Sequence, residues 1–259
     1  ACAGVTKAHS LLASLPEVDA NRIGVTGVSW GGFLTCLAAG IDARYRCAAP
    51  VYGCGFVSDE SIWTVDGSFS SLTQDQRQVW RENWDPAAVL PRAKLPMLWL
   101  NGSNDFAYWP PIWQRSVNAS AGPRQMCMKV RWPHGHIPAA EEVREIERFF
   151  QTHLLDCQPM VSISPPILDH GVLSADYRSS KAGLPLRTAN LILTIDEGPW
   201  PERQWHVLPT EIDEQNQTVS ARLPVQTKVA YLSLLSQDWL NSTSELVFVD
   251  DDQPQADER

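Results

Sequence analysis

The chain has 259 residues, of which 44% are apolar and 20% charged, and a formal net charge of −9. These values are typical of a folded globular protein with one large or two modest domains, and they exclude a disordered or fibrous chain. The acidic balance argues against nucleic acid or an anionic membrane surface as a partner, because both require clustered Lys and Arg.

The first half of the chain alternates apolar runs with helical stretches, the pattern of a parallel sheet covered by helices. No apolar run approaches the roughly 20 residues that would span a bilayer. A helix over 1–15 is predicted to lead into a first strand. We predict strands at 23–26, 47–52, 97–100 and 126–132, and helices at 33–39 and 141–155.

Between the second and third strands lies a long stretch, about 55–92, rich in Trp, Ser, Asp and Gln. Segments of this length inside a compact domain are usually lids or binding insertions. We therefore expect a lid-like insertion with helical turns near 75–84.

The pattern changes after residue 155. A Pro-rich segment, 157–166, is followed by short β-type runs separated by turn residues, which is typical of a β-sandwich. The runs are 190–195, 204–208, 218–223, 228–235 and 245–249. We expect an α/β catalytic domain over 1–157, a β-sandwich domain over 158–250 and an acidic disordered tail over 251–259.

A G-x-S-x-G pattern, Gly27-Val28-Ser29-Trp30-Gly31, lies between the first predicted strand and the helix that follows. In this context the pattern is a nucleophile elbow, a turn so tight that glycine is needed two residues to either side of the serine. The turn presents Ser29 Oγ at the N-terminus of the helix. There the backbone N–H of Trp30 can donate to an oxyanion. We therefore predict Ser29 as a nucleophile.

A serine hydroxyl needs a base, and the base needs an acid that orients it. In proteins with a nucleophile elbow, the acid follows the serine in the chain and stands on a loop at the end of a strand. Asp105 follows the strand at 97–100 and fits this rule. Asp66 and Asp85 are weaker candidates, because neither follows a convincing strand.

The base is expected in the segment that follows the strand at 126–132. Two histidines stand there, His134 and His136, and one of them should face Ser29. We favour His136, which belongs to a Gly-His pair just before the terminal helix, and keep His134 as the alternative.

The N-terminal half is rich in tryptophan. Trp99 and Trp132 are expected to pack in the core. The others of interest are expected on loops near the catalytic face, where they either stack on a sugar ring or flat acyl group or pack within the insertion: Trp30, Trp63, Trp109 and Trp113. The six cysteines show no metal-type spacing, so we predict no metal and leave disulfides open.

With these residues identified, the first part resembles the acetylxylan esterase and prolyl-oligopeptidase-related branch of the α/β-hydrolases. The resemblance covers most of residues 15–155. It rests on VDANRIGVTGVSWGG (18–32), APVYGCG (49–55), PMLWLNGSND (96–105) and the His134-Gly135-His136 triplet. The stretches at 198–200, 203–205 and 230–234 are similar to the β-sandwich appended to some members.

This resemblance implies cleavage of acyl esters without a cofactor, often of acetyl groups on polysaccharides. It also implies several strands before the nucleophile, so we expect the sequence to be incomplete at its N-terminus. The second oxyanion donor would then lie outside this chain, as would any signal peptide, which leaves a secreted or periplasmic location open.

Three functions follow from these observations. The first is a carboxylic-ester hydrolase that acts on a small-molecule or glycan ester through an acyl-enzyme. The second is a serine peptidase of the prolyl-oligopeptidase type. The third is a non-catalytic module that binds carbohydrate or protein. The oligomeric state stays open.

Overall fold

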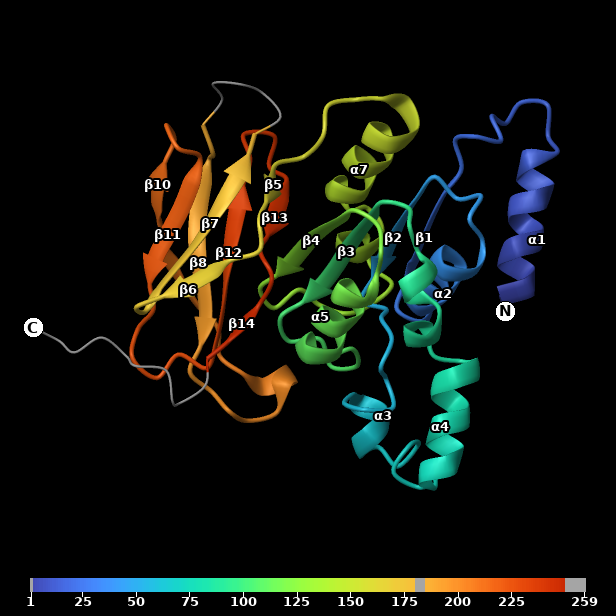
Figure 1. Cartoon of the computed structure of the whole chain (residues 1–259), viewed down its shortest axis with the longest axis horizontal. Helices are drawn as coiled ribbons and strands as arrows, with labels where there is room; N and C mark the ends of the chain where they lie inside the picture. The colour runs from blue at the N-terminus through green and yellow to red at the C-terminus, as the bar shows by residue number, and fades with distance from the viewer. Residues whose placement is uncertain (1, 180–184, 250–259) are drawn as a thin grey trace, which may run out of the picture.

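The computed structural model describes residues 2–179 and 185–249, and the acidic tail expected over 251–259 lies outside them. In the N-terminal part, residues 2–157, four strands form one parallel sheet in the order β1-β2-β3-β4 (Figure 1). Their bounds are β1 Gly24–Val28, β2 Cys47–Val51, β3 Met97–Gly102 and β4 Arg124–Lys129. Every residue of β2 and β3 is buried, which is why these strands are apolar runs and do not alternate.

Helices surround this sheet. The N-terminal part contains α1 Cys2–Ala13, α2 Trp30–Ile41, α5 Pro110–Ala119, α6 Pro138–Glu141 and α7 Arg144–Leu155. Phe33 of α2, Ile112 of α5 and Phe149 of α7 belong to one buried apolar cluster with the strands. The predicted helix 33–39 is shorter than α2, and the predicted helix 141–155 is longer than α7. No helix was predicted at α5.

The insertion between β2 and β3 consists of short helices joined by turns and loops. It contains α3 Ile62–Val65, α4 Gln74–Asn83 and two short 3₁₀ helices, η1 Pro86–Ala88 and η2 Leu90–Arg92. The start of α4 is a capping box, in which Thr73 Oγ1 accepts from the Gln76 N–H and the Gln76 side chain accepts from the Thr73 N–H. Figure 1 shows α3 and α4 below the sheet.

The C-terminal part is described over residues 158–179 and 185–249, which contain two antiparallel sheets. One consists of β5 Ser162–Ile163, β6 Ile167–Asp169, β7 Val172–Arg178, β10 Glu211–Asp213 and β11 Thr218–Arg222. The other consists of β8 Thr188–Thr194, β9 His206–Pro209, β12 Val229–Leu235, β13 Asn241–Thr243 and β14 Val247–Phe248. Leu173 and Val219 of the first sheet share one buried cluster with Leu191 and Leu232 of the second.

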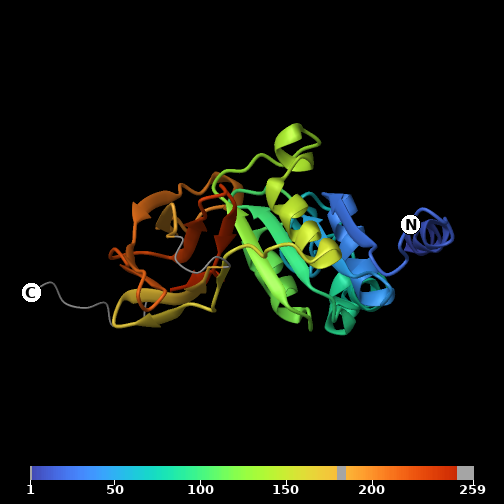
Figure 2. The same cartoon turned by 90° about the horizontal axis from the view of Figure 1, so that it is seen from above.

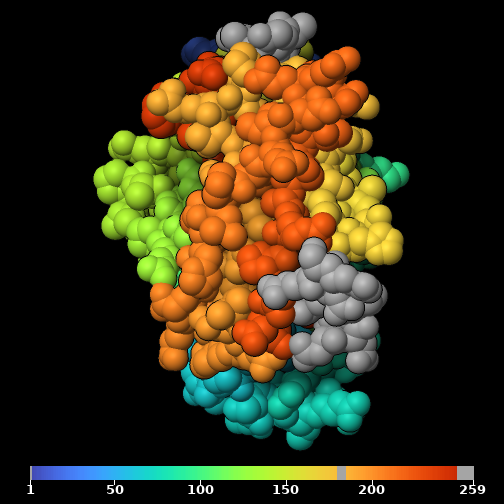
Figure 3. All heavy atoms as spheres, turned by 90° about the vertical axis from the view of Figure 1, so that its left-hand side faces the viewer, coloured from blue at the N-terminus to red at the C-terminus, as the bar shows by residue number. Residues whose placement is uncertain are grey.

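The second of these sheets packs against the parallel sheet at the edge of β4. The Met128 N–H of β4 donates to Thr243 Oγ1 at 3.1 Å, and the Leu246 N–H donates to Gln114 Oε1 at 3.0 Å. Trp205 and Tyr231 belong to the apolar cluster of the N-terminal part. The two parts are therefore joined by apolar packing and by hydrogen bonds. Figure 2 shows from above how the two parts lie side by side. Figure 3 shows the side of the molecule that the antiparallel sheets cover.

Three general properties bear on function. None of the helices in residues 2–179 and 185–249 has the length and apolar character that a membrane crossing requires. Over the same residues, no group of His, Cys, Asp or Glu side chains is placed to hold a metal ion. All six cysteines are free thiols.

Candidate active site

Ser29 lies in the sharp turn between β1 and α2. Its backbone has φ 58° and ψ −116°, a positive-φ conformation that residues other than glycine rarely adopt and that the surrounding structure holds in place. The Ser29 N–H donates to the Val51 carbonyl at 2.9 Å, and its own carbonyl accepts from the Phe33 N–H at 3.0 Å. These bonds place Ser29 at the carboxyl end of the sheet and at the N-terminus of α2.

Glycines make this turn possible, although not in the way that the pattern predicts. A Cβ on Gly27 would lie 2.5 Å from the carbonyl group of Gly31, so Gly27 is required as expected. A Cβ on Gly31 would meet nothing within 4 Å, so the expected need for glycine there is wrong. The second tight position is Gly32, where a Cβ would lie 2.4 Å from the Val51 carbonyl oxygen and 2.8 Å from the Gly53 nitrogen.

Ser29, His134 and Asp105 form one chain of hydrogen bonds. His134 Nε2 lies 2.7 Å from Ser29 Oγ, and His134 Nδ1 lies 2.7 Å from Asp105 Oδ2. Because a carboxylate only accepts, Nδ1 donates to Asp105 and Nε2 is left to accept from the Ser29 hydroxyl. The side chains of His134 and Asp105 are only 6% and 0% exposed, so water competes little for these bonds.

Asp105 is held by its own loop. Its Oδ1 accepts from the N–H groups of Ala107 and Tyr108, at 2.8 and 2.7 Å. The second oxygen is thereby directed at the imidazole. The weaker acidic candidates lie elsewhere: Asp66 accepts from the Ser68 N–H on the surface, and Asp85 caps η1.

The preference for His136 is wrong, because His134 is the histidine that faces Ser29. The side chain of His136 is 71% exposed and contacts Glu141 Oε1 at 3.1 Å. Two features turn the segment this way. The hydroxyl of Tyr52 donates to the carbonyl of Pro133 at 2.8 Å, which fixes the chain just before His134. Soon after it, α6 begins at Pro138.

Aromatic side chains enclose the imidazole of His134. The Tyr52 ring stacks on it with centroids 4.3 Å apart and planes 15° apart, and the Phe106 ring lies 4.8 Å away. Tyr108 lies parallel to the imidazole at 6.2 Å. Burial, and secondarily the nearby Asp105 charge, raises the pKa of Tyr52, so the phenol stays a neutral donor. We did not predict these residues, although Tyr52 and Phe106 both follow strand ends on the catalytic face.

The four tryptophans expected near Ser29 differ in their surroundings. Trp30 begins α2 and Trp63 lies within α3, so their expected place on loops is wrong. Trp30 is 47% exposed and stacks on Phe33, while the partly buried Trp63 lies edge-on to Trp30 and to Tyr108. Trp109 caps α5 and donates its indole N–H to the Phe106 carbonyl.

Trp113 lies within α5 and is fully buried in the core, so its expected place on a loop is wrong and it cannot stack on a substrate. Trp99 and Trp132 are buried in the same cluster, as expected.

The backbone around Ser29 provides a possible oxyanion donor. Trp30 is the first residue of α2, and the N–H groups of a helix's first turn have no acceptor within the helix. An anion at Ser29 would therefore meet a free N–H at the positive end of the helix dipole.

Solved structures of hydrolases are similar to part of this chain. An acetyl xylan esterase from Paenibacillus sp. R4 is 26% identical, with a TM-score of 0.51 over 59% of this chain and 52% of its own. A puromycin-hydrolyzing peptidase from Mycobacterium tuberculosis is 23% identical, with a TM-score of 0.48 over 57% and 24%. An acylaminoacyl peptidase from Pyrococcus horikoshii is 18% identical, with a TM-score of 0.49 over 58% and 27%.

The match spans about half the length of the acetyl xylan esterases, 52% and 51%. No curated protein sequence matches the chain. A sequence model described as the prolyl oligopeptidase family matches residues 3–154, more than half of the 259 residues. The chain therefore belongs to the prolyl oligopeptidase family, within the α/β-hydrolase superfamily.

Proposed function

We propose that this protein is a serine hydrolase that cleaves carboxylic esters through an acyl-enzyme. The observation that carries the proposal is the position of His134, which is hydrogen-bonded at 2.7 Å both to Ser29 Oγ and to Asp105 Oδ2. A hydroxyl, an imidazole and a carboxylate in this order are the groups that nucleophilic catalysis at an acyl carbon requires.

In the first half of the proposed reaction, Ser29 Oγ attacks the acyl carbon while His134 Nε2 takes the hydroxyl proton. Asp105 keeps the proton on Nδ1 and stabilises the imidazolium that forms. The carbonyl oxygen becomes negative, and the Trp30 N–H at the start of α2 donates to it. When the tetrahedral intermediate collapses, His134 gives its proton to the leaving alcohol and an ester to Ser29 remains.

In the second half, a water molecule takes the place of the alcohol. His134 removes a proton from this water as it attacks the acyl carbon, and the proton then passes to Ser29 Oγ as the acid leaves. Both halves use the same imidazole as base and then as acid. The proposed reaction needs no cofactor.

Two observations favour esters over peptides, and acetyl esters of carbohydrates among them. The structural neighbour with 26% identity and a TM-score of 0.51 is named an acetyl xylan esterase. Beside Ser29, the Trp30 ring is 47% exposed, which offers a surface on which a sugar ring or a flat acyl group can stack. The family description instead names an oligopeptidase, so a serine peptidase is the second candidate.

One comparison separates the two candidates. We expect the purified protein to hydrolyse p-nitrophenyl acetate with a kcat/KM far above that for Gly-Pro p-nitroanilide, and the reverse order would favour the peptidase. Release of acetate from acetylated xylan would support the carbohydrate substrate. A folded protein that cleaves neither substrate and gives no covalent adduct with a fluorophosphonate would instead be a binding module.

We further infer that residues 158–249 form a β-sandwich domain that packs on the catalytic domain, with the boundary near residue 157. The support is the buried cluster that the two antiparallel sheets share, distinct from the cluster around the parallel sheet. Limited proteolysis that cuts first near residue 157 would agree with this boundary.

A further inference from the structure

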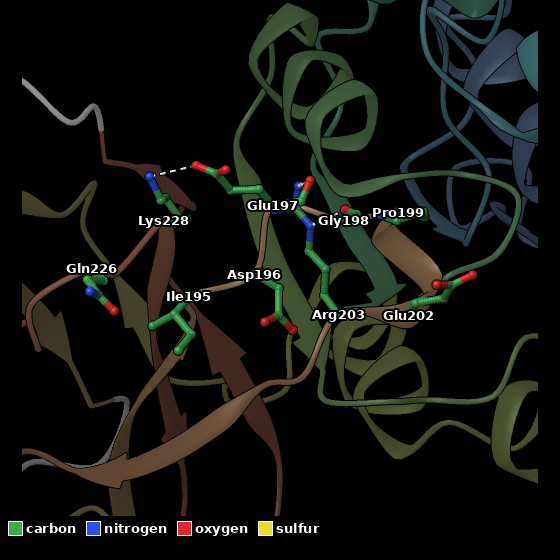
Figure 4. Close-up of a pocket in the computed structure, with 9 residues that line it drawn as sticks. All are labelled: Ile195, Asp196, Glu197, Gly198, Pro199, Glu202, Arg203, Gln226 and Lys228. Atoms are coloured by element: carbon green, nitrogen blue, oxygen red, sulfur yellow. Dashed lines mark hydrogen bonds and ion pairs between the residues drawn. The ribbon is translucent and has the colours of Figure 1, made fainter.

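One segment of the C-terminal part reaches the loops that carry Asp105 and His134. It is the connection between β8 and β9, residues 195–205, which contains the short helix η3 Trp200–Glu202. Figure 4 shows this connection projecting from the strands toward the N-terminal part. It contacts three segments that follow strands of the parallel sheet, through Glu60, Asn104 and Arg131.

The most direct contact is made by Asn104, the residue before Asp105. Its side-chain amide donates to the backbone carbonyls of Arg203 at 2.7 Å and Pro201 at 3.1 Å, with the Trp200 carbonyl at 3.4 Å. An amide nitrogen has two N–H groups, so the two shorter contacts use both of them. The backbone just before Asp105 is thereby fixed to a segment about a hundred residues later in the chain.

The same connection also reaches the loop of His134. The Ser103 hydroxyl donates to Asn104 Oδ1 at 2.8 Å, and Ser103 Oγ accepts from the Arg131 N–H at 3.0 Å. The Arg131 guanidinium donates to the side chain of Gln204. The two loops that supply the acid and the base are thus joined to each other and to the connection.

The connection itself has a fixed shape. Trp200 is 7% exposed, and its indole N–H donates to Glu60 Oε1 at 3.0 Å. The Arg203 guanidinium stacks over the Trp200 ring at 3.5 Å, and its Nε donates to the Gly198 carbonyl. On its other side the connection lines a cavity of about 770 Å³. Figure 4 shows this cavity and the ion pair between Glu197 and Lys228 at its edge. These contacts make the connection a firm support for Asn104.

We propose that the 195–205 connection is a positioning element for the Asp105–His134 pair, and that Asn104 is the positioning residue through which it acts. This inference rests on the proposed function. Catalytic groups must be held within roughly 0.5 Å of their productive geometry, and a misplacement of about 1 Å costs on the order of 100-fold in rate. The C-terminal part would then contribute to turnover without touching the substrate.

The test replaces Asn104 and follows turnover with p-nitrophenyl acetate. We expect Asn104→Ala to lower kcat by about 10-fold or more, because Asp105 and His134 are held less firmly. KM should change little, because the surface that binds the substrate is unchanged. The matched control is Asn216→Ala, which removes an amide bonded to Asp213 in a distant exposed turn and should leave kcat unchanged. Gln204→Ala changes an exposed position and should also lower kcat, by a smaller factor than Asn104→Ala.

A second readout does not depend on turnover. The Nδ1 proton that His134 shares with Asp105 should give a low-field proton resonance that is absent from His134→Ala. We expect this resonance to weaken or disappear in Asn104→Ala and to persist in Asn216→Ala. If Asn104→Ala does not fold, Gln204→Ala decides the matter with the same two readouts.

The outcomes separate the two claims. If the wild type neither turns over nor labels with a fluorophosphonate, the proposed function fails, and the resonance alone still decides the positioning role. If folded Asn104→Ala keeps both the wild-type kcat and the resonance, the positioning role is overturned. If Asn104→Ala does not fold, a Gln204→Ala variant that keeps both the wild-type kcat and the resonance overturns the positioning role.

Discussion

The ring of Tyr52 stacks on the imidazole of His134, with centroids 4.3 Å apart, while its hydroxyl donates to the carbonyl of Pro133 at 2.8 Å. One side chain thus fixes both the plane of the imidazole and the backbone that precedes it. Tyr52 has no exposed surface, so both contacts are shielded from water. This explains physically why His134, and not His136, lies against Ser29.

Removing only the hydroxyl of Tyr52 should therefore reduce activity moderately. Tyr52→Phe keeps the stacked ring and loses one buried hydrogen bond, which is worth about 1 kcal/mol. We expect kcat/KM for p-nitrophenyl acetate to fall roughly 5-fold for this variant. Tyr231→Phe is the matched control, because it also loses a buried phenol hydroxyl, one that donates to the Met128 carbonyl and not to the segment before His134. Equal activities for both variants would contradict the role of Tyr52.

The two histidines of the loop should behave in opposite ways. His134→Ala removes the base and should lower kcat/KM by at least about 1,000-fold, since general-base catalysis contributes on the order of 100- to 10,000-fold and the hydrogen bond to Asp105 is lost with it. His136→Ala removes a side chain that is 71% exposed and should leave kcat/KM within roughly 2-fold. A large loss in His136→Ala with none in His134→Ala would restore the assignment that the sequence favoured.

Neighbouring glycines after Ser29 should differ sharply in tolerance. Gly32→Ala places a Cβ 2.4 Å from the Val51 carbonyl oxygen, so the elbow must shift, and overpacking of this kind costs about 1–3 kcal/mol. Gly31→Ala meets nothing within 4 Å in a helix, where alanine is favoured over glycine by about 1 kcal/mol.

Thermal unfolding and ester turnover check this pair together. We expect Gly32→Ala to lower both Tm and kcat, and Gly31→Ala to raise Tm slightly at near-normal kcat. Similar behaviour of the two variants would contradict the geometry of the turn.

Much of the catalytic face could be predicted from short-range patterns. Ser29 directly follows β1, and Asp105 lies three residues after the end of β3, so both positions can be read from strands that the sequence displays as short apolar runs. The choice between His134 and His136 could not be predicted in this way. It depends on the contact of Tyr52 with Pro133, 81 residues further along the chain, and on where β4 ends.

The missed elements have local reasons. Helix α5 begins with two prolines and continues with Trp, Ser and Asn, which are weak helix formers, so its sequence resembles a loop. It is helical because Ile112, Trp113 and Val117 are fully buried against the sheet. The strand β7 was missed because it follows a Pro-rich segment, and its buried alternation at Leu173, Ala175 and Tyr177 is short.

Four thiols should be unreactive in the folded protein. Burial raises the pKa of Cys47 to about 12 and raises the pKa values of Cys36, Cys54 and Cys127 as well, so all four stay protonated at neutral pH. With a disulfide reagent such as DTNB, we expect the exposed Cys157 to react first and the partly exposed Cys2 more slowly. The other four should react only after denaturant is added, and their rapid reaction in native protein would contradict the packing around β2 and β4.

The most direct test of the proposed reaction is the site of covalent modification by a fluorophosphonate. The probe reacts with a serine only where a base has activated it, and peptide mass spectrometry then locates the adduct. We predict a single adduct on Ser29 in the wild type, strongly reduced labelling in His134→Ala and none in Ser29→Ala. An adduct on another serine, or a folded wild type that carries no adduct, would contradict the assignment of Ser29 as the nucleophile.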